Sequence, residues 1–341
     1  MFKVYNDKKK FLKLIDRCKD AKIEKDLETG LQTLSLKLPV TDEYLSIIDE
    51  EGYIETEDYW YVIKEKNYST NDFFEVFCNA DIEELKYSLI PVYDVIDLNV
   101  QQAMEKALTY INSTWSIEYN SKVANTVEYK LANKSAYEIL ESIKAEFSLE
   151  LIYDTKNKKV KVYTKAGKNR GMLFNNELRL KTLKRQGQSY NICTVVYPLG
   201  KDGLNIGSVN NSINFVENYS YTNKYLPVYY IDEDIDKAQD LKIAAETYLN
   251  QHCAPIVGYS LSLSALPKEI ELGDTIILVD KLKRVKTPQR VMKIIQYPFE
   301  PEKDKVEISN RIIDFSRMIN HINTSYEEKI EYIRQNLKEL K

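Results

Sequence analysis

The sequence has 341 residues, enough for about two or three domains, and its 43% hydrophobic and 29% charged residues are typical of a folded globular protein. Its 48 basic and 52 acidic residues are spread along the chain, and the net charge of -4 argues against sequence-specific binding of nucleic acid. The four cysteines lie far apart without Cys-x-x-Cys spacing, which argues against a disulfide framework and a structural zinc site. No apolar run approaches the roughly 18 to 20 residues that cross a bilayer, and the polar N-terminus lacks a secretory signal, so we expect cytoplasmic synthesis and no membrane segment.

Residues 1–95 read mainly as strands and are expected to form an N-terminal β-barrel-like domain. Leucines alternate with polar residues over 34–38, residues 59–63 are rich in aromatic and β-branched side chains, and a further strand is predicted over 73–78. The apolar run at 11–18 is too short to distinguish a helix from a strand, so both remain open.

The pattern changes to helical spacing near residue 97. A first helix is predicted after Asn99, because Gln102 three residues later completes a capping box. A second helix is predicted to start at Ser135, where Glu138 occupies the reciprocal position, and to end near residue 148. Both helices therefore carry their own start signals.

Alternating apolar residues at 149–153 and at 160–162 flank a turn-prone segment and predict a hairpin. Residues 96–175 thus look like an α+β insertion, and the chain as a whole is predicted to be α+β and mainly β. The next segment, 176–249, is expected to hold returning strands, one of them at Thr194–Tyr197, and a helix from about residue 234 to 249.

A second barrel-like β domain is predicted over residues 250–318. Its four strand candidates are residues 259–266, 275–279, 290–295 and 305–308. Leu38-Pro39 precedes Tyr61–Lys64 by about the same interval as Leu266-Pro267 precedes Arg290–Lys293. This match suggests an internal duplication, with chance similarity between strand-rich segments as the alternative.

The sequence offers little catalytic chemistry. It has only two histidines, His252 and His321, and no histidine cluster for a metal, so neither a catalytic site, a metal site nor a cofactor is expected. His252 and Cys253 are neighbours in sequence, and neighbouring side chains diverge, which favours a packed pair at a helix end over a nucleophile pair. The glycines at 200, 203 and 207 fit neither the dinucleotide nor the P-loop spacing and indicate a surface hairpin.

Two further patterns allow a carbohydrate interpretation. Carboxylate clusters occur at 49–51, 81–84 and 300–304, and could supply an acid and a base for glycoside hydrolysis, although such clusters are more often solvated loops. The aromatic run Tyr59–Tyr61 could stack on a sugar, but alternate residues of a strand normally belong to the core. We predict core for this run.

The C-terminal segment 319–341 is predicted to be a helix with a coiled-coil seam. Its apolar residues recur at spacings of four and three: Tyr326, Ile330, Ile333, Leu337 and Leu340. An oligomerising helix is the favoured interpretation, and an amphipathic helix that packs back on its own domain is the alternative, because about two heptads are short for a free coil.

Several segments together resemble the prophage endopeptidase tail family of phage minor tail proteins, the hub region of tail-associated lysins. The segments that carry the resemblance are Tyr61–Glu65, Thr114-Trp115, Asn191–Gly203, Tyr248-Leu249, Pro255, Leu272–Asp274, Arg290-Val291 and Val306–Asn310. The resemblance implies a fold similar to the trimeric hub of contractile-tail baseplates, with two related β-barrels and α+β insertions in each subunit.

The resemblance also implies a function. It predicts a homotrimeric ring at the virion tail tip that closes the tail tube, passes DNA, and contacts the distal tail protein, the tape-measure protein and tail-tip proteins. Longer relatives append a peptidoglycan-cleaving domain, and the sequence ends at Lys341 without one, so we expect no enzyme. The alternatives are a peptidoglycan hydrolase and a carbohydrate-binding module for host recognition, for which Trp60 and Trp115 would be the residues to test.

Overall fold

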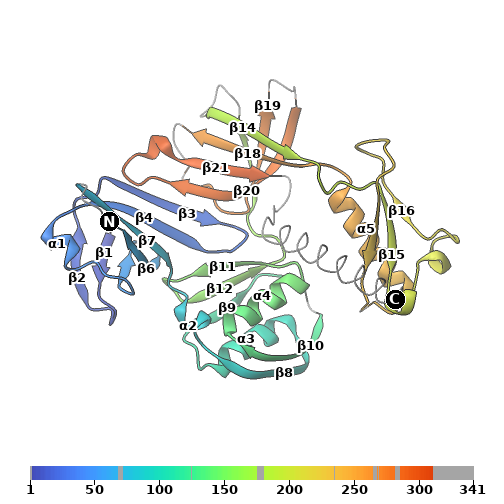
Figure 1. Cartoon of the computed structure of the whole chain (residues 1–341), viewed down its shortest axis with the longest axis horizontal. Helices are drawn as coiled ribbons and strands as arrows, with labels where there is room; N and C mark the ends of the chain where they lie inside the picture. Colours follow the sequence, from blue (N-terminus) through green and yellow to red (C-terminus); the bar gives the residue numbers. More distant parts are fainter. Residues whose placement is uncertain are drawn as a thin grey trace, which may run out of the picture. The chain divides into compact units, whose positions relative to one another are not determined.

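The computed structural model describes residues 2–67, 72–123, 125–174, 180–233, 235–263, 267, 269–280 and 285–309 (Figure 1). The chain forms two compact units, one made of residues 1–184 and 260–341 and the other of residues 185–259. Each unit is described by itself. The predicted fold class, α+β and mainly β, is confirmed, because strands hold more of the described residues than helices do.

A 13-stranded sheet forms the framework of the first unit. Its strands are β1 (Phe2–Tyr5), β2 (Phe11–Ile15), β3 (Asp20–Asp26), β4 (Gln32–Pro39), β5 (Tyr53–Glu55), β6 (Trp60–Asn67), β7 (Phe73–Ala80), β13 (Asn169–Phe174), β14 (Leu180–Gln188), β18 (Ile256–Leu263), β19 (Thr275–Asp280), β20 (Val285–Gln296) and β21 (Lys305–Ser309). The strands predicted in residues 34–38, 59–63 and 73–78 are confirmed as β4, β6 and β7. Leucines 34, 36 and 38 of β4 are all buried, as the alternation predicts.

The undecided run at residues 11–18 is settled by tertiary pairing. β2 is a strand because it pairs antiparallel with β1, which places Phe2 opposite Ile15 and lets both side chains enter the core. A run this short has no period of its own, so the neighbouring strand decides its conformation.

The two strand-rich regions of the sequence meet in this one sheet. β3 pairs antiparallel with β20, with Lys25 opposite Ile294 and Ile23 opposite Gln296 (Figure 1). The predicted strands at 275–279, 290–295 and 305–308 are confirmed as β19, β20 and β21, and β18 covers the described part of 259–266. The division into five segments and the internal duplication stay predictions.

The segment predicted as an α+β insertion packs on the same core. Its elements are β8 (Ile90–Asn99), α3 (Val100–Tyr110), β9 (Ser116–Tyr119), β10 (Thr126–Lys134), α4 (Ala136–Glu146), β11 (Glu150–Asp154) and β12 (Lys159–Tyr163). Two short helices precede it, α1 (Asp42–Leu45) and α2 (Glu83–Lys86). β8 and β10 form a two-stranded ribbon, and β9 pairs parallel with β12 beside the predicted hairpin of β11 and β12.

Both capping boxes are confirmed. The Asn99 side chain accepts from the backbone N–H of Gln102 at 2.9 Å, and the Asn99 backbone N–H donates to the Gln102 side chain at 3.1 Å. Ser135 and Glu138 make the same reciprocal pair at 3.2 and 2.8 Å. Each box satisfies helix N–H groups that have no partner inside the helix.

The second unit is a small α/β layer. β15 (Val195–Leu199) lies between β16 (Val216–Glu217) and β17 (Pro227–Ile231), and α5 (Ala238–His252) packs on one face of the three strands. Short 3-10 turns, η1 (Lys201–Gly203) and η2 (Gly207–Val209), connect β15 to β16, and η3 (Pro301–Lys303) precedes β21 in the first unit. The predicted strand over 194–197 is confirmed.

The helix α5 starts at Ala238, not near residue 234 as the sequence predicts. The preceding residues are tied instead to the glycine loop, because Lys201 N–H donates to Ile235 O at 2.9 Å and Asp232 N–H donates to Leu199 O at 2.9 Å. Asp232 and Ile235 therefore bond to β15 and to the loop after it, not along a helix. In the part of the chain that the structure describes, no helix is long and apolar enough to cross a membrane.

Candidate functional site

A buried polar junction joins the α+β insertion to the large sheet. Arg290 of β20 forks onto Glu150 of β11, with Nη1 to Oε1 at 2.6 Å and Nη2 to Oε2 at 2.9 Å. The same guanidinium donates to the carbonyl of Ala166 at 2.9 Å, and Ala166 N–H donates to Glu150 at 2.6 Å. Glu150 is only 5% exposed. Two parallel bonds between a guanidinium and a buried carboxylate fix both position and direction.

Asp274 completes this junction on the sheet side. Its fully buried carboxylate accepts from the backbone N–H of Lys168 at 2.7 Å and from Arg170 Nε at 2.9 Å. Gly167 and Gly273 both have φ of +80°, and a Cβ on Gly167 would lie 2.1 Å from the carbonyl carbon of Gly273. Only glycine therefore allows the two backbones to approach this closely.

The junction is built for position, not for reaction. Each carboxylate is matched by an arginine or by backbone N–H groups, and no nucleophile or histidine lies among these residues. Two of the segments that carry the family resemblance, Leu272–Asp274 and Arg290-Val291, meet here. Their spacing in sequence did not indicate this ion pair, because Glu150 lies 140 residues from Arg290.

A second ionic cluster surrounds Glu55 near the aromatic run. Glu55 accepts from Tyr5 at 2.5 Å and from Lys3 at 3.2 Å, and it also pairs with Lys156. Burial acts to raise the pKa of the Glu55 carboxyl, but the hydrogen bonds from Lys156, Tyr5 and Lys3 outweigh it and lower this pKa to about 2. The cluster ties β1 and β5 to the β11–β12 turn.

The aromatic run belongs mainly to the core, as predicted. Tyr59 and Tyr61 are 2% and 0% exposed. Trp60 is half-buried, and its ring centroid lies 4.8 Å from that of Tyr5. The Lys9 ammonium lies 5.2 Å from the Trp60 ring centroid. Trp115 is 5% exposed, so neither tryptophan presents an open face of the kind that a sugar stacks on.

The carboxylate clusters are held by lysines and loop groups. Glu51 and Glu83 both pair with Lys64, and Lys66 pairs with Asp49 at 3.0 Å. This pairing supports the interpretation of solvated loops.

Glu84 is the most strongly held carboxylate of these clusters. It accepts from Ser113 at 2.7 Å, from Lys158 at 3.0 Å and from both the backbone and the hydroxyl of Thr114. Burial opposes ionisation, but these hydrogen bonds lower the pKa of Glu84 to about 2. The carboxylate thereby fixes the loop in front of Trp115 and is not a free acid.

The neighbouring pair at 252 and 253 has the predicted place at a helix end. His252 is the last residue of α5, and its ring stacks on Tyr248 with centroids 4.1 Å apart. Cys253 is buried and packs in the core of the second unit. His321 lies outside the described residues, and among the described ones no group of histidine, cysteine and acidic residues could hold a metal.

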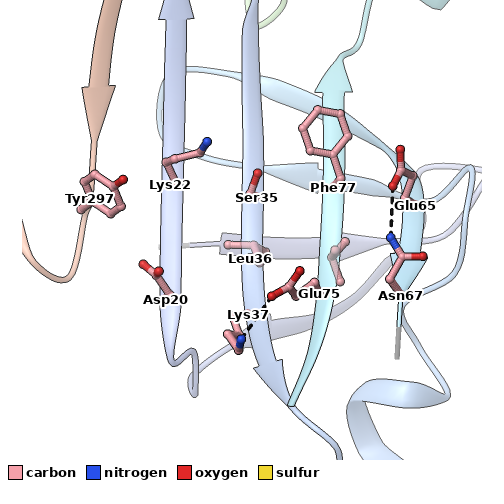
Figure 2. A pocket seen from close by; sticks show the side chains of 11 residues that line it. Asp20, Lys22, Ser35, Leu36, Lys37, Glu65, Asn67, Glu75, Phe77 and Tyr297 are labelled. Carbon is pink, nitrogen blue, oxygen red and sulfur yellow. Dashed lines mark hydrogen bonds and ion pairs between the residues drawn. The ribbon is translucent and has the colours of Figure 1, made fainter. Parts of the chain in front are cut away.

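One open hollow of about 460 Å³ lies on the large sheet. Figure 2 shows it lined by side chains of β3, β4, β6 and β7 and by Tyr297. Lys37 of β4 pairs with Glu75 of β7 at 3.1 Å, and Asn67 donates to Glu65 within β6 at 3.1 Å. The hollow shows no convergent acid and base.

The second unit carries an aromatic surface that sequence reasoning missed. On the sheet face opposite α5, the Tyr197 ring lies 5.8 Å from that of Tyr229 and 5.3 Å from that of Phe215, and its hydroxyl lies 2.9 Å from that of Tyr225. Tyr225 and Tyr229 are 58% and 69% exposed. The high strand propensity of the segment Pro-Val-Tyr-Tyr-Ile at 227–231 was the signal in the sequence that could have indicated this strand. Exposed tyrosines of this kind are typical of protein interfaces.

The predicted oligomerising residues cannot be placed. Tyr326, Ile330, Ile333, Leu337 and Leu340 lie outside the described residues, and the C-terminal helix stays a prediction.

Comparison with known proteins adds the family and the fold. A family model described as prophage endopeptidase tail matches residues 168–319, which confirms the resemblance noted in the sequence. No curated protein matches the sequence.

Solved structures resemble almost the whole chain. The prophage tail protein gp18 of Listeria monocytogenes is 13% identical with a TM-score of 0.66, over 96% of this chain and 99% of that one. The 43 kDa tail protein of prophage MuSo2 from Shewanella oneidensis is 9% identical with a TM-score of 0.66, over 90% and 97%. The c3393 component of the Escherichia coli type VI secretion system is 12% identical with a TM-score of 0.52, over 91% and 76%. The chain therefore has the fold of prophage tail proteins.

Proposed function

We propose that this chain is a structural hub protein in the tail tip of a phage or prophage-derived particle. The observation that carries the proposal is the fold shared with the Listeria tail protein over 96% of this chain and 99% of that one. Coverage this high on both sides concerns the architecture of nearly all of both chains and not one common module.

In this proposal the chain forms a homotrimeric ring that closes the tail tube and passes DNA. The ring would contact the distal tail protein, the tape-measure protein and tail-tip proteins, and it would assemble in the bacterial cytoplasm before it resides at the virion tail tip. The polar junction of Glu150, Asp274 and Arg290 suits a structural role, because a fully paired buried polar network makes the contact between sheet and insertion rigid.

The proposed role is structural and non-enzymatic. Among the described residues, the carboxylates with strongly lowered pKa values, Glu55 and Glu84, are held by lysines and hydroxyls. A general acid needs the opposite, a pKa raised toward the working pH. The word endopeptidase in the family description keeps a peptidoglycan hydrolase as the alternative.

Purified particles test the structural role. Mass spectrometry of particles from the strain that encodes the chain should detect it in the tail fraction, and deletion of its gene should give tails without a normal tip in electron micrographs. Complementation with the wild-type gene is the control. Absence of the chain from purified particles would contradict the hub proposal.

Cell walls test the alternative. The purified chain incubated with peptidoglycan should release no soluble peptides or sugars, whereas lysozyme in a parallel reaction should release muropeptides. Release of soluble peptides or sugars by the purified chain, absent from a mock purification, would establish a hydrolase instead.

A further inference from the structure

Two edge strands of this chain have free sides. β2 (Phe11–Ile15) ends the large sheet, and β17 (Pro227–Ile231) ends the three-stranded sheet, so among the described strands each is paired on one side only. A free strand edge presents backbone N–H and C=O groups to which another strand can add. Both strands have five residues.

β2 is apolar and lies in a basic stretch. Phe11, Leu12 and Leu14 are 49%, 38% and 39% exposed, which is unusual for three apolar residues on one short strand. The turn Lys8–Lys10 directly before β2 is exposed. Residues 1–19 hold seven lysines and arginines against two aspartates. β2 is therefore a basic edge.

β17 is apolar and lies next to an acidic stretch. Tyr229 and Ile231 are 69% and 63% exposed, while Val228 and Tyr230 pack toward α5 and hold the strand in place. Residues 232–240 hold five acidic residues and one lysine. Glu233 and Asp236 in this segment are exposed. β17 is therefore an acidic edge.

We propose that β2 of one copy of this chain pairs antiparallel with β17 of a second copy. The lysines precede β2 and the carboxylates follow β17, so only the antiparallel direction brings the basic turn beside the acidic segment. In that register Phe11 lies opposite Ile231, so two exposed apolar side chains meet across the contact.

A second copy is the occupant that the charges favour. Each edge has an excess of one sign, so only the mixed pair brings an excess of positive charge beside an excess of negative charge. Because the two edges differ, the contact is head-to-tail, and repetition of a head-to-tail contact closes a ring when the rotation allows it. The inference rests on the proposed function only for the number of copies in that ring.

Cysteine cross-linking in the full-length chain tests the pairing. Phe11→Cys and Ile231→Cys are made in separate chains, mixed and treated with a mild oxidant. The pairing predicts a covalent dimer in the mixture on a non-reducing gel, several-fold stronger than in either variant alone. Leu89→Cys, at a site that is 68% exposed and away from both edges in sequence, replaces Ile231→Cys in the control mixture. Wild-type chain, in which three of the four cysteines are buried, gives the background.

Charge exchange makes the test specific. Adding Lys8→Glu and Lys10→Glu to the Phe11→Cys chain should reduce the dimer several-fold, and adding Glu233→Lys and Asp236→Lys to the Ile231→Cys chain should restore it. These four side chains are exposed, and a far-UV circular dichroism spectrum that matches the wild-type chain confirms that each variant is folded.

The outcomes separate the possibilities. If the mixture gives no more covalent dimer than its Leu89→Cys control, the pairing is overturned. This result is expected if another tail protein occupies these edges. Strong dimer from Ile231→Cys alone overturns it in favour of two like edges. Cross-linking of a chain that is absent from particles would leave the pairing intact and refute the hub function, so the two failures are distinguishable.

Discussion

Removal of the Arg290 side-chain charge should destabilise the first unit strongly. In Arg290→Met, Glu150 keeps its 2.6 Å bond from Ala166 N–H but loses both guanidinium donors, at 2.6 and 2.9 Å, while it stays 5% exposed. Leaving one partner of a buried ion pair unmatched costs about 3–5 kcal/mol. The expected loss in free energy of unfolding lies in that range.

Tryptophan emission during urea unfolding measures this loss selectively. Both tryptophans, Trp60 and Trp115, belong to the first unit, so their emission follows the unit that contains the junction. Lys37→Met is the matched control, because Lys37 pairs with Glu75 at the surface, where their side chains are 38% and 67% exposed. The control should change the free energy of unfolding by less than about 1 kcal/mol.

A double variant separates the ion pair from general packing. Arg290→Met with Glu150→Gln removes the uncompensated charge, so it should be less destabilised than the sum of the two single variants. A loss below about 1 kcal/mol for Arg290→Met, or strict additivity in the double variant, would refute the argument that this buried pair fixes the insertion to the sheet.

Three further predictions concern substitutions of single residues. The pKa of the Glu55 carboxyl is about 2 in the folded chain, against an ordinary value of 4.5. The ionised carboxylate therefore stabilises the fold fully at pH values above 4.5, and this stabilisation is lost as the pH falls toward 2. Glu55→Gln, which cannot accept as an anion from Lys156, should lower the melting temperature most at neutral pH, and a deficit that does not shrink on acidification contradicts this. Ser135→Ala removes the N-terminal cap of α4 and should cost about 0.5–2 kcal/mol in urea unfolding, with an unchanged midpoint counting against it. Gly30→Ala should destabilise by more than about 1 kcal/mol, because Gly30 has φ of +66° and its Cβ would meet the Leu151 carbonyl oxygen at 1.8 Å; a stable variant would refute the close approach.

The sequence by itself determined the local elements. The capping boxes at Asn99 and Ser135 start their helices at the predicted residues, because both partners of each box lie within one helical turn. The hairpin of β11 and β12 follows for the same reason, since its alternation and its turn residues are neighbours in the chain. The burial of alternate leucines in β4 likewise follows from the sequence, because side chains of a strand alternate between its two faces.

The tertiary structure alone decided which distant segments meet. Nothing in the pattern of β3 identifies β20, about 270 residues away, as its neighbour, and nothing around Glu150 points to Arg290. The start of α5 and the strand character of β2 were likewise set by backbone bonds to other segments. Local signals act within a few residues, whereas these contacts depend on the tertiary packing of the whole chain. Residues that meet after more than a hundred intervening positions therefore show no regular spacing by which a single sequence would predict their contact.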